Sequence, residues 1–176
     1  MNIRFRFIER FDLIMDRSYG KFRGNVKIRS IRPADQERAQ ALVIQGLRDN
    51  FGEKFNESNR FPDLEEIVEW YPDDTFLVAE SKGEVVATGA LIREASDTGR
   101  IVRMSVDSPY RSRGIGTRML AALKDAAVGR GYTRLVVETT SSWEYVARFY
   151  LNNDFEITGY RDEVGEVDFL LRLADR

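Results

Sequence analysis

The chain has 176 residues and a formal net charge of −2, so neither nucleic acid nor a membrane surface is indicated as a partner of the whole protein. It contains no cysteine and no histidine, which excludes a disulfide, a cysteine nucleophile, a histidine-based triad and a zinc site built from these residues. No apolar run reaches the ~18 residues of a membrane-spanning helix, so we expect a cytoplasmic protein without a metal.

The first 24 residues differ from the rest of the chain. They carry a net charge of +3, whereas the remainder carries −5. Arginines and acidic residues interrupt every apolar stretch, which excludes a secretory signal peptide. Three alternatives stay open for residues 1–24: an extra edge strand, a flexible arm, or translated upstream sequence with the true start at Met15. We expect a single domain over residues 25–176 after this extension.

The first half of the expected domain predicts one strand followed by two helices. β-rich sequence, apolar residues at helical spacing and prolines that suit a first helical turn mark these elements. We predict a strand over 26–31, a helix from Pro33 to about Arg48, a polar loop over 50–61 and a second helix from Pro62 that ends at residues 72–74.

The second half changes to a period-two pattern and then alternates strands with helices. Ser141 or Ser142 is suited to cap the last helix. We predict strands over 75–80, 84–93, 100–106, 134–139, 155–160 and 167–173, a helix from 115 to Gly129 or Gly131, and a helix over 143–152. The order βααβββαβαββ begins with antiparallel hairpins and indicates a mixed α/β (α+β) sheet, not a doubly wound parallel one.

Residues 111–116 place two arginines and two glycines directly before a predicted helix. The first amides of a helix have no partner within it, and together with the helix dipole they attract anions. Gly114 and Gly116 would let a phosphate approach the backbone, and Arg111 and Arg113 would add positive charge. The stretch therefore predicts a pyrophosphate site. A strand-to-helix turn with solvated arginines is the alternative, because two glycines alone are weak evidence.

The same stretch, Arg111-Ser112-Arg113-Gly114-Ile115-Gly116, resembles the Arg/Gln-x-x-Gly-x-Gly/Ala signature of the GNAT superfamily of acyl-CoA-dependent N-acetyltransferases. "IVRMSV" and "RLVVET" are similar to the family's fourth and fifth strands, "WEYVARFYLNNDF" to its last helix and the strand after it, and "IRSIRPAD" to its opening strand and turn. The resemblance covers residues 26–173. It implies a GNAT fold, in which a central, mostly antiparallel twisted sheet of about seven strands is flanked by about four helices.

Three positions depart from the family pattern. Trp143 stands where asparagine is usual, Val146 where alanine is usual and Asp154 where glycine is usual. The asparagine often helps to orient the cofactor arm or the following helix, so its role is not carried over to Trp143. Valine for alanine is a mild packing change, and aspartate adopts the left-handed conformation more easily than most residues.

The resemblance implies acetyl-CoA as the co-substrate, with its pantetheine arm lying between the splayed fourth and fifth strands. Main-chain groups of Met104, Ser105 and Val106 would bind that arm, and one of these amides, first of all that of Val106, would polarise the thioester carbonyl. The pyrophosphate would lie against the start of the next helix. The residues implied to cradle it are Arg111, Ser112, Arg113, Gly114, Ile115, Gly116 and Thr117.

Tyr150 falls where the family's general acid lies, so the resemblance implies that it returns a proton to the leaving thiolate. Its helical spacing with Val146 and Phe149 is equally typical of core packing. Glu138, near the end of a predicted strand, is the first candidate for the base that deprotonates an amine, and Glu80 is the second. A solvated surface carboxylate is the alternative for both.

Two function classes remain open. The first is an N-acetyltransferase acting on a primary amine of a small molecule or peptide, and the second is a GNAT-like domain that senses acyl-CoA without turnover. Arg93, Arg100 and Arg103 either hold a substrate carboxylate or form surface ion pairs. Acceptor specificity is expected in the loop 49–61 and in the turn 159–166, whose net charge of −2 suits a cationic amine. Family members often dimerise, so a homodimer is compatible with the sequence.

Overall fold

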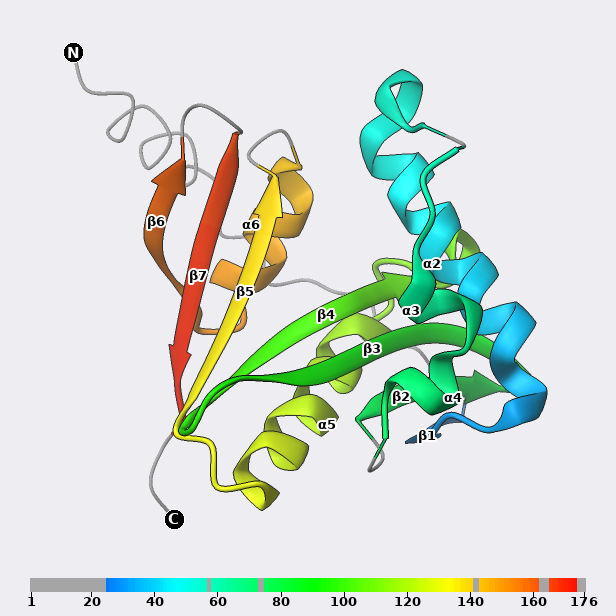
Figure 1. The fold of residues 1–176 in the computed structure, drawn as a ribbon, viewed down its shortest axis with the longest axis horizontal. Coiled ribbons are helices and arrows are strands. Elements are labelled where there is room, and N and C mark those ends of the chain that lie inside the picture. The colour runs from blue at the N-terminus through cyan, green and yellow to red at the C-terminus, as the bar shows by residue number, and fades with distance from the viewer. Residues whose placement is uncertain (1–24, 57, 73–74, 141–142, 162–164, 174–176) are drawn as a thin grey trace.

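A single sheet organises the protein, whose computed structural model describes residues 25–56, 58–72, 75–140, 143–161 and 165–173. Residues 1–24 and the capping candidates Ser141 and Ser142 lie outside the described residues. The seven strands lie in the order β1-β2-β3-β4-β5-β7-β6, and every neighbouring pair is antiparallel except β4 with β5 (Figure 1). This arrangement confirms the mixed α/β, mostly antiparallel sheet that was predicted.

The elements follow one another in the predicted order. The strands are β1 (Val26–Ser30), β2 (Phe76–Ser81), β3 (Glu84–Ala95), β4 (Thr98–Val106), β5 (Arg134–Thr140), β6 (Glu156–Arg161) and β7 (Glu166–Arg172). The helices are α2 (Gln36–Phe51), α3 (Pro62–Glu65), α4 (Ile67–Trp70), α5 (Ile115–Gly129) and α6 (Glu144–Leu151), with 3-10 turns at Pro33–Asp35, Gly52–Lys54 and Ser108–Tyr110. Asp154 has a φ of +71°, the left-handed conformation expected at this glycine position of the family.

Two buried clusters lie on opposite faces of the sheet. One joins β1–β5 and β7 to α5 and α6, and the other joins β2–β4 to α2, α3 and α4. Figure 1 shows the consequence: α2, α3 and α4 lie over the β1–β4 half on one face, while α5 and α6 lie behind the sheet. No helix in the described part of the chain is long and apolar enough to cross a membrane.

The single helix predicted from Pro62 to residues 72–74 is wrong, because two four-residue helices, α3 and α4, stand there. Glu66 between them has φ −139° and ψ 66°, outside the helical region. The side chain of Gln36 inserts at this break: its Nε2 donates to the Leu64 carbonyl at 2.8 Å, and its Oε1 accepts from the Ile67 amide at 2.9 Å. A contact from a distant residue therefore replaces the bonds that a continuous helix would have made.

The strands β4 and β5 part soon after they meet. They pair only where Thr98–Arg100 lies beside residues 134–136, although β5 stays paired with β7 as far as Thr140. On its other side β4 stays paired with β3 as far as Val106. The main-chain groups of β4 beyond Arg100 that point toward β5 therefore have no strand partner within the described residues. This is the splay that the resemblance implied.

A bulge interrupts β4 beside this splay. The register with β3 shifts between Thr88 and Ala90, and Arg103 on the bulged strand has a φ of +55°. Such a conformation is uncommon for a residue with a side chain, and bulges often re-aim the strand next to active sites. The Thr88 hydroxyl donates to the Arg103 carbonyl at 2.9 Å and so holds the bulge in place.

Candidate active site

A cavity of about 140 Å³ lies where β4 and β5 part. Four elements line it: α2 on one face of the sheet, β4 and β5 within the sheet, and α6 on the other face. Both predicted catalytic residues, Tyr150 and Glu138, border this cavity, together with Met104 from the bulged strand. The structure therefore brings together, around one space, side chains that are far apart in the sequence.

Tyr150 on α6 lies both in the packed core and at the cavity, so core packing and a place in the site, the two interpretations left open by the sequence, hold together. It is 3% exposed, and its ring packs against Phe149, Phe155 and Phe169 with centroids 5.2, 5.3 and 5.8 Å away. The same residue also borders the cavity. Burial raises the pKa of its phenol above the ordinary value, because the anion would lose its hydration. The phenol therefore keeps its proton, and its role as an acid stays a prediction.

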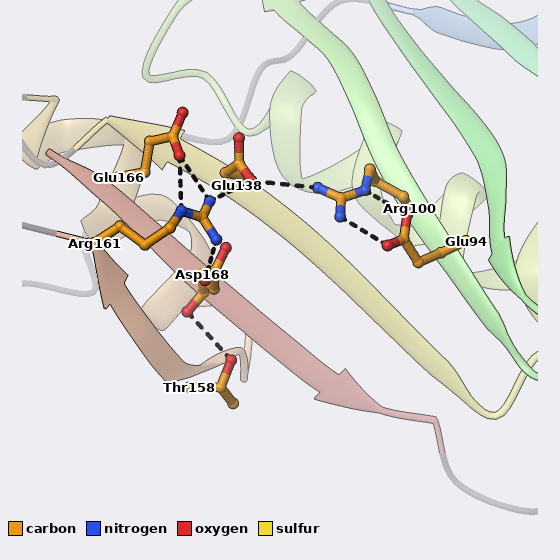
Figure 2. Close-up of polar contacts among 7 residues, drawn as sticks. All are labelled: Glu94, Arg100, Glu138, Thr158, Arg161, Glu166 and Asp168. Carbon is orange, nitrogen blue, oxygen red and sulfur yellow. Dashed lines mark hydrogen bonds and ion pairs between the residues drawn. The ribbon is translucent and has the colours of Figure 1, made fainter. Parts of the chain in front are cut away.

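Glu138 on β5 is held by arginines (Figure 2). Its carboxylate accepts from Nη2 of Arg161 at 2.5 Å and lies 3.6 Å from Nη1 of Arg100. Arg161 also donates to Glu166 at 2.8 Å and to Asp168 at 2.9 Å, and these contacts raise the pKa of its guanidinium. Glu138 is thus oriented by two cations at the rim of the cavity.

The other carboxylate and arginine candidates form ion pairs. Glu80 accepts from Arg29 at 2.7 Å and does not border the cavity. Arg100 donates to Glu94 at 2.7 Å, and Arg103 donates to both carboxylate oxygens of a buried aspartate, Asp63, at 2.8 and 2.7 Å. Arg100 and Arg103 thus both form ion pairs, and Arg103 also borders the cavity, so a role toward a substrate carboxylate stays a prediction.

The main chain of β4 alternates in direction, as in every antiparallel pair. The Asp107 amide donates to the Val86 carbonyl at 2.9 Å and so faces β3. Val106, one residue earlier, must turn its amide and carbonyl toward β5. By the same alternation Ser105 faces β3, and the Met104 carbonyl, which shares a peptide plane with the Ser105 amide, points toward β5. Two of the three predicted strand residues thus direct main-chain groups into the splay.

The hydroxyl of Ser105 has a structural contact instead. It donates to the Leu42 carbonyl on α2 at 2.8 Å. The approach is close enough that a Cβ added at Gly46 on α2 would lie 2.6 Å from this oxygen. Ser105 therefore sets the position of α2 against β4, and its role toward a cofactor stays a prediction.

The start of α5 offers free amides. Gly114 precedes the helix with a φ of +80°, a conformation suited to glycine. Within the described residues, the amides of Ile115, Gly116 and Thr117 donate no hydrogen bond to the protein. A Cβ added at Gly116 would come within 3.3 Å of the Phe149 ring, so this glycine also lets α5 approach α6. The geometry fits an anion at the helix start.

The two motif arginines contact the protein through their side chains. Arg111 donates to the Val106 carbonyl at 2.8 Å and to Asp49 at the end of α2 at 2.5 Å. The guanidinium of Arg113 lies 6.0 Å from the centre of the Tyr110 ring. Arg111 therefore ties the loop before α5 to β4 and α2.

Two features of the cavity were missed in the sequence analysis. Trp143 packs edge-on against Phe51 at 4.9 Å, so α6 meets the end of α2 beside the cavity. Thr139 on β5 borders the cavity, and its hydroxyl is buried without a hydrogen-bond partner among the described residues. The alternation of the strand could have placed Thr139 on the buried side with Leu135 and Val137, but nothing local indicated the contact of Trp143 with Phe51.

The family model of the acetyltransferase (GNAT) family matches residues 44–155, more than half of the chain. The chain belongs to the GNAT acetyltransferase family. The matched range contains β4, β5, α6 and the second half of α2, which line the cavity, and α5 with its free helix start. The expectation of an acyltransferase is therefore confirmed at the level of the family.

Named relatives agree with this assignment. An IAA acetyltransferase of Azospirillum brasilense is 38% identical over 61% of this chain and 71% of its own length. Human N-acetylaspartate synthetase is 30% identical over 76% of this chain but only 47% of its own length. Among solved structures, the yncA protein of Salmonella typhimurium with its cofactor acetyl-CoA superposes with a TM-score of 0.70, at 20% identity over 86% of this chain and 96% of its own. That likeness shows a common fold.

Proposed function

We propose that the protein transfers the acetyl group of acetyl-CoA to a primary amine of a small molecule or peptide. One observation carries the proposal: a cavity between the splayed strands β4 and β5 is bordered by a buried tyrosine on one face of the sheet and a carboxylate at its rim. The family supports the acetyl transfer, and a solved structure of the same fold holds acetyl-CoA.

The protein groups fit acetyl-CoA in two places. The pyrophosphate would accept from the amides of Ile115, Gly116 and Thr117, where no side chain at Gly114 or Gly116 stands in the way. The pantetheine arm would lie along the open side of β4 and replace the strand that is missing there. An arm in this position would direct the thioester into the cavity.

The amide that polarises the thioester carbonyl is better assigned to Met104 than to Val106. Met104 borders the cavity with Tyr150, whereas Val106 is absent from its lining. Val106 lies nearer the start of α5 and would serve the arm. Removing one such donor from an active site typically costs about 3 kcal/mol of transition-state stabilisation.

The proton transfers follow from the two side chains. The acceptor amine must lose a proton before it attacks the carbonyl carbon, and the Glu138 carboxylate would accept it. As the new C–N bond forms, the C–S bond breaks and leaves a thiolate. The Tyr150 phenol, kept protonated by burial, would protonate that sulfur.

Replacing Tyr150 by phenylalanine tests the proposal. We expect kcat to fall about 10²-fold, because the thiolate would leave without a proton donor, while the affinity for acetyl-CoA stays close to that of the wild type. Thiol release measures kcat, and calorimetry measures the affinity. Tyr132→Phe, at a half-buried tyrosine outside the cavity, is the matched control. Full activity of Tyr150→Phe at every pH would refute the acid role.

A sensor that binds acyl-CoA without turnover is the second candidate. Two observations favour it: Trp143 stands at the family's asparagine position, and two arginines already engage Glu138. Thiol release over a panel of amino acids, polyamines, aminoglycosides and peptide N-termini separates the candidates. Tight binding of acetyl-CoA with no release above the hydrolysis background would support the sensor.

A further inference from the structure

Thr139 buries a hydroxyl that nothing in the protein satisfies. The residue is 6% exposed and borders the cavity, and its Oγ1 has no hydrogen-bond partner among the described residues. Buried hydroxyls in native proteins nearly always have a partner, so each exception calls for an explanation. A group that enters the cavity only when a ligand binds is one such partner.

The other two buried threonines of the described chain are satisfied. Thr88 donates to the Arg103 carbonyl at 2.9 Å, and Thr98 donates to the Asp97 carboxylate at 2.9 Å. Thr139 stands opposite Val167 of β7, a fully buried aliphatic residue. Valine would therefore suit the packing at position 139 better than threonine. The hydroxyl can gain a hydrogen bond only from a group in the cavity.

The face of the sheet decides which ligand the hydroxyl meets. Successive side chains of a strand point to opposite faces. Glu138 lies on the face where Arg161 and Arg100 hold it, and Thr139 lies on the opposite face, which packs toward α6 and Tyr150. An acceptor amine that uses Glu138 as its base approaches from the first face. The hydroxyl of Thr139 therefore faces the side of the splay where the thioester end of the arm would lie.

We propose that the Thr139 hydroxyl binds the pantetheine arm of acetyl-CoA through a hydrogen bond to the amide nearest the thioester. This inference rests on the proposed function. A hydroxyl both donates and accepts, and the arm's amide offers a carbonyl and an N–H, so either direction of the bond is available. The bond would give the arm a side-chain contact on β5 opposite its main-chain contacts on β4, and it would fix how deeply the thioester enters the cavity.

Replacing Thr139 by valine separates binding from stability. We expect the Kd of both CoA and acetyl-CoA to rise about three- to tenfold, the usual effect of losing one neutral hydrogen bond. The ligand-free melting temperature should equal or exceed that of the wild type, since no hydrogen bond of the apo protein is lost. Thr139→Ser keeps the hydroxyl and should keep an affinity close to the wild type.

Thr98→Val is the matched control. Thr98 is also a strand threonine with 6% exposure, but its hydroxyl bonds within the protein and lies outside the cavity. This variant should melt at a lower temperature and bind both ligands with unchanged Kd. A wild-type Kd in Thr139→Val would overturn the inference and leave the proposed function standing. Failure of the wild type to bind either ligand would overturn both.

Discussion

Glu138 lies at the rim of the cavity with a guanidinium on either side of its carboxylate. If it removes the proton from the amine, Glu138→Gln should lower kcat about 10²-fold, because an amide cannot accept that proton. The Kd of acetyl-CoA should stay unchanged, since the main chain of β4 and the start of α5, which would bind it, are untouched. Steady-state kinetics with both substrates varied, together with calorimetry, would measure the two effects.

Asp168→Asn is the control for this variant. Asp168 also accepts from Arg161, at 2.9 Å, and has a similar side-chain exposure of 33% against 37% for Glu138, but it does not border the cavity. It should keep most of the activity. Equal losses in the two variants would mean that Glu138 works only by positioning Arg161.

Single residues of the site were predictable where they lie within one continuous stretch of sequence that resembles the family. Tyr150 lies within "WEYVARFYLNNDF", the stretch that resembles the family's last helix, and it borders the cavity together with Glu138. The partner of the motif arginine was not predictable. Arg111 bonds to Asp49, 62 positions earlier, and a surface arginine gives no local sign of which carboxylate it will meet.

The bulge in β4 contacts another element, the short helix α3. Asp63 on α3 accepts both hydrogen bonds of Arg103 and one from the Tyr71 hydroxyl at 2.6 Å, and its side chain is only 10% exposed. Asp63→Asn leaves this guanidinium, 24% exposed, without a charged partner, so we expect about 2 kcal/mol less stability. We also expect a fall in kcat, since Met104 directly follows the bulge. Urea unfolding and thiol release would measure both.

Glu65→Gln provides the control on the same short helix. Its ion pair with Arg60 is exposed, with side-chain exposures of 47% and 80%, and exposed pairs contribute little to stability. The variant should unfold at the same urea concentration as the wild type. If Asp63→Asn did so too, the pair with Arg103 would not hold the bulge.

Elements with a clear period were predictable, and elements shaped by distant contacts were not. The alternation of β5 and the helical spacing of α5 follow from local sequence, and both elements stand where they were expected. Gln36 bonds to the break between α3 and α4, and Asp63 bonds to Arg103 in the bulge of β4. In each case the side chain of a residue distant in the sequence bonds to backbone groups or to a charged side chain. The local sequence pattern does not show which of these groups will meet.

The molecule as a whole is organised as two halves of one sheet. The short ladder between β4 and β5, called the seam below, joins them. β1–β4 carry α2, β5–β7 carry α6, and the ladder between β4 and β5 spans only three residues on each strand. Beyond the seam, the Phe51 ring at the end of α2 meets the Trp143 ring at the start of α6 at 4.9 Å. This ring pair therefore connects the halves on the far side of the cavity.

A double-mutant cycle tests whether the halves are connected there. Phe51→Ala and Trp143→Ala should each destabilise the protein, and their combined effect should differ from the sum by about 1 kcal/mol, the usual coupling of an edge-on aromatic pair. Chemical unfolding of the four proteins gives this coupling. The same cycle between Trp143 and Trp70, which is 58% exposed on α4, should be additive.

Binding of acetyl-CoA shows whether the ring pair sets the width of the splay or is only a packing contact. If the ring pair holds the splay at the width that the pantetheine arm needs, Trp143→Ala should weaken acetyl-CoA binding, and Phe51→Ala should weaken it by a similar factor although Phe51 does not border the cavity. An effect of Trp143→Ala alone would mean that the indole contacts the ligand directly. Additive unfolding energies would mean that the rings do not meet in solution, and the width of the splay would then depend on the seam alone.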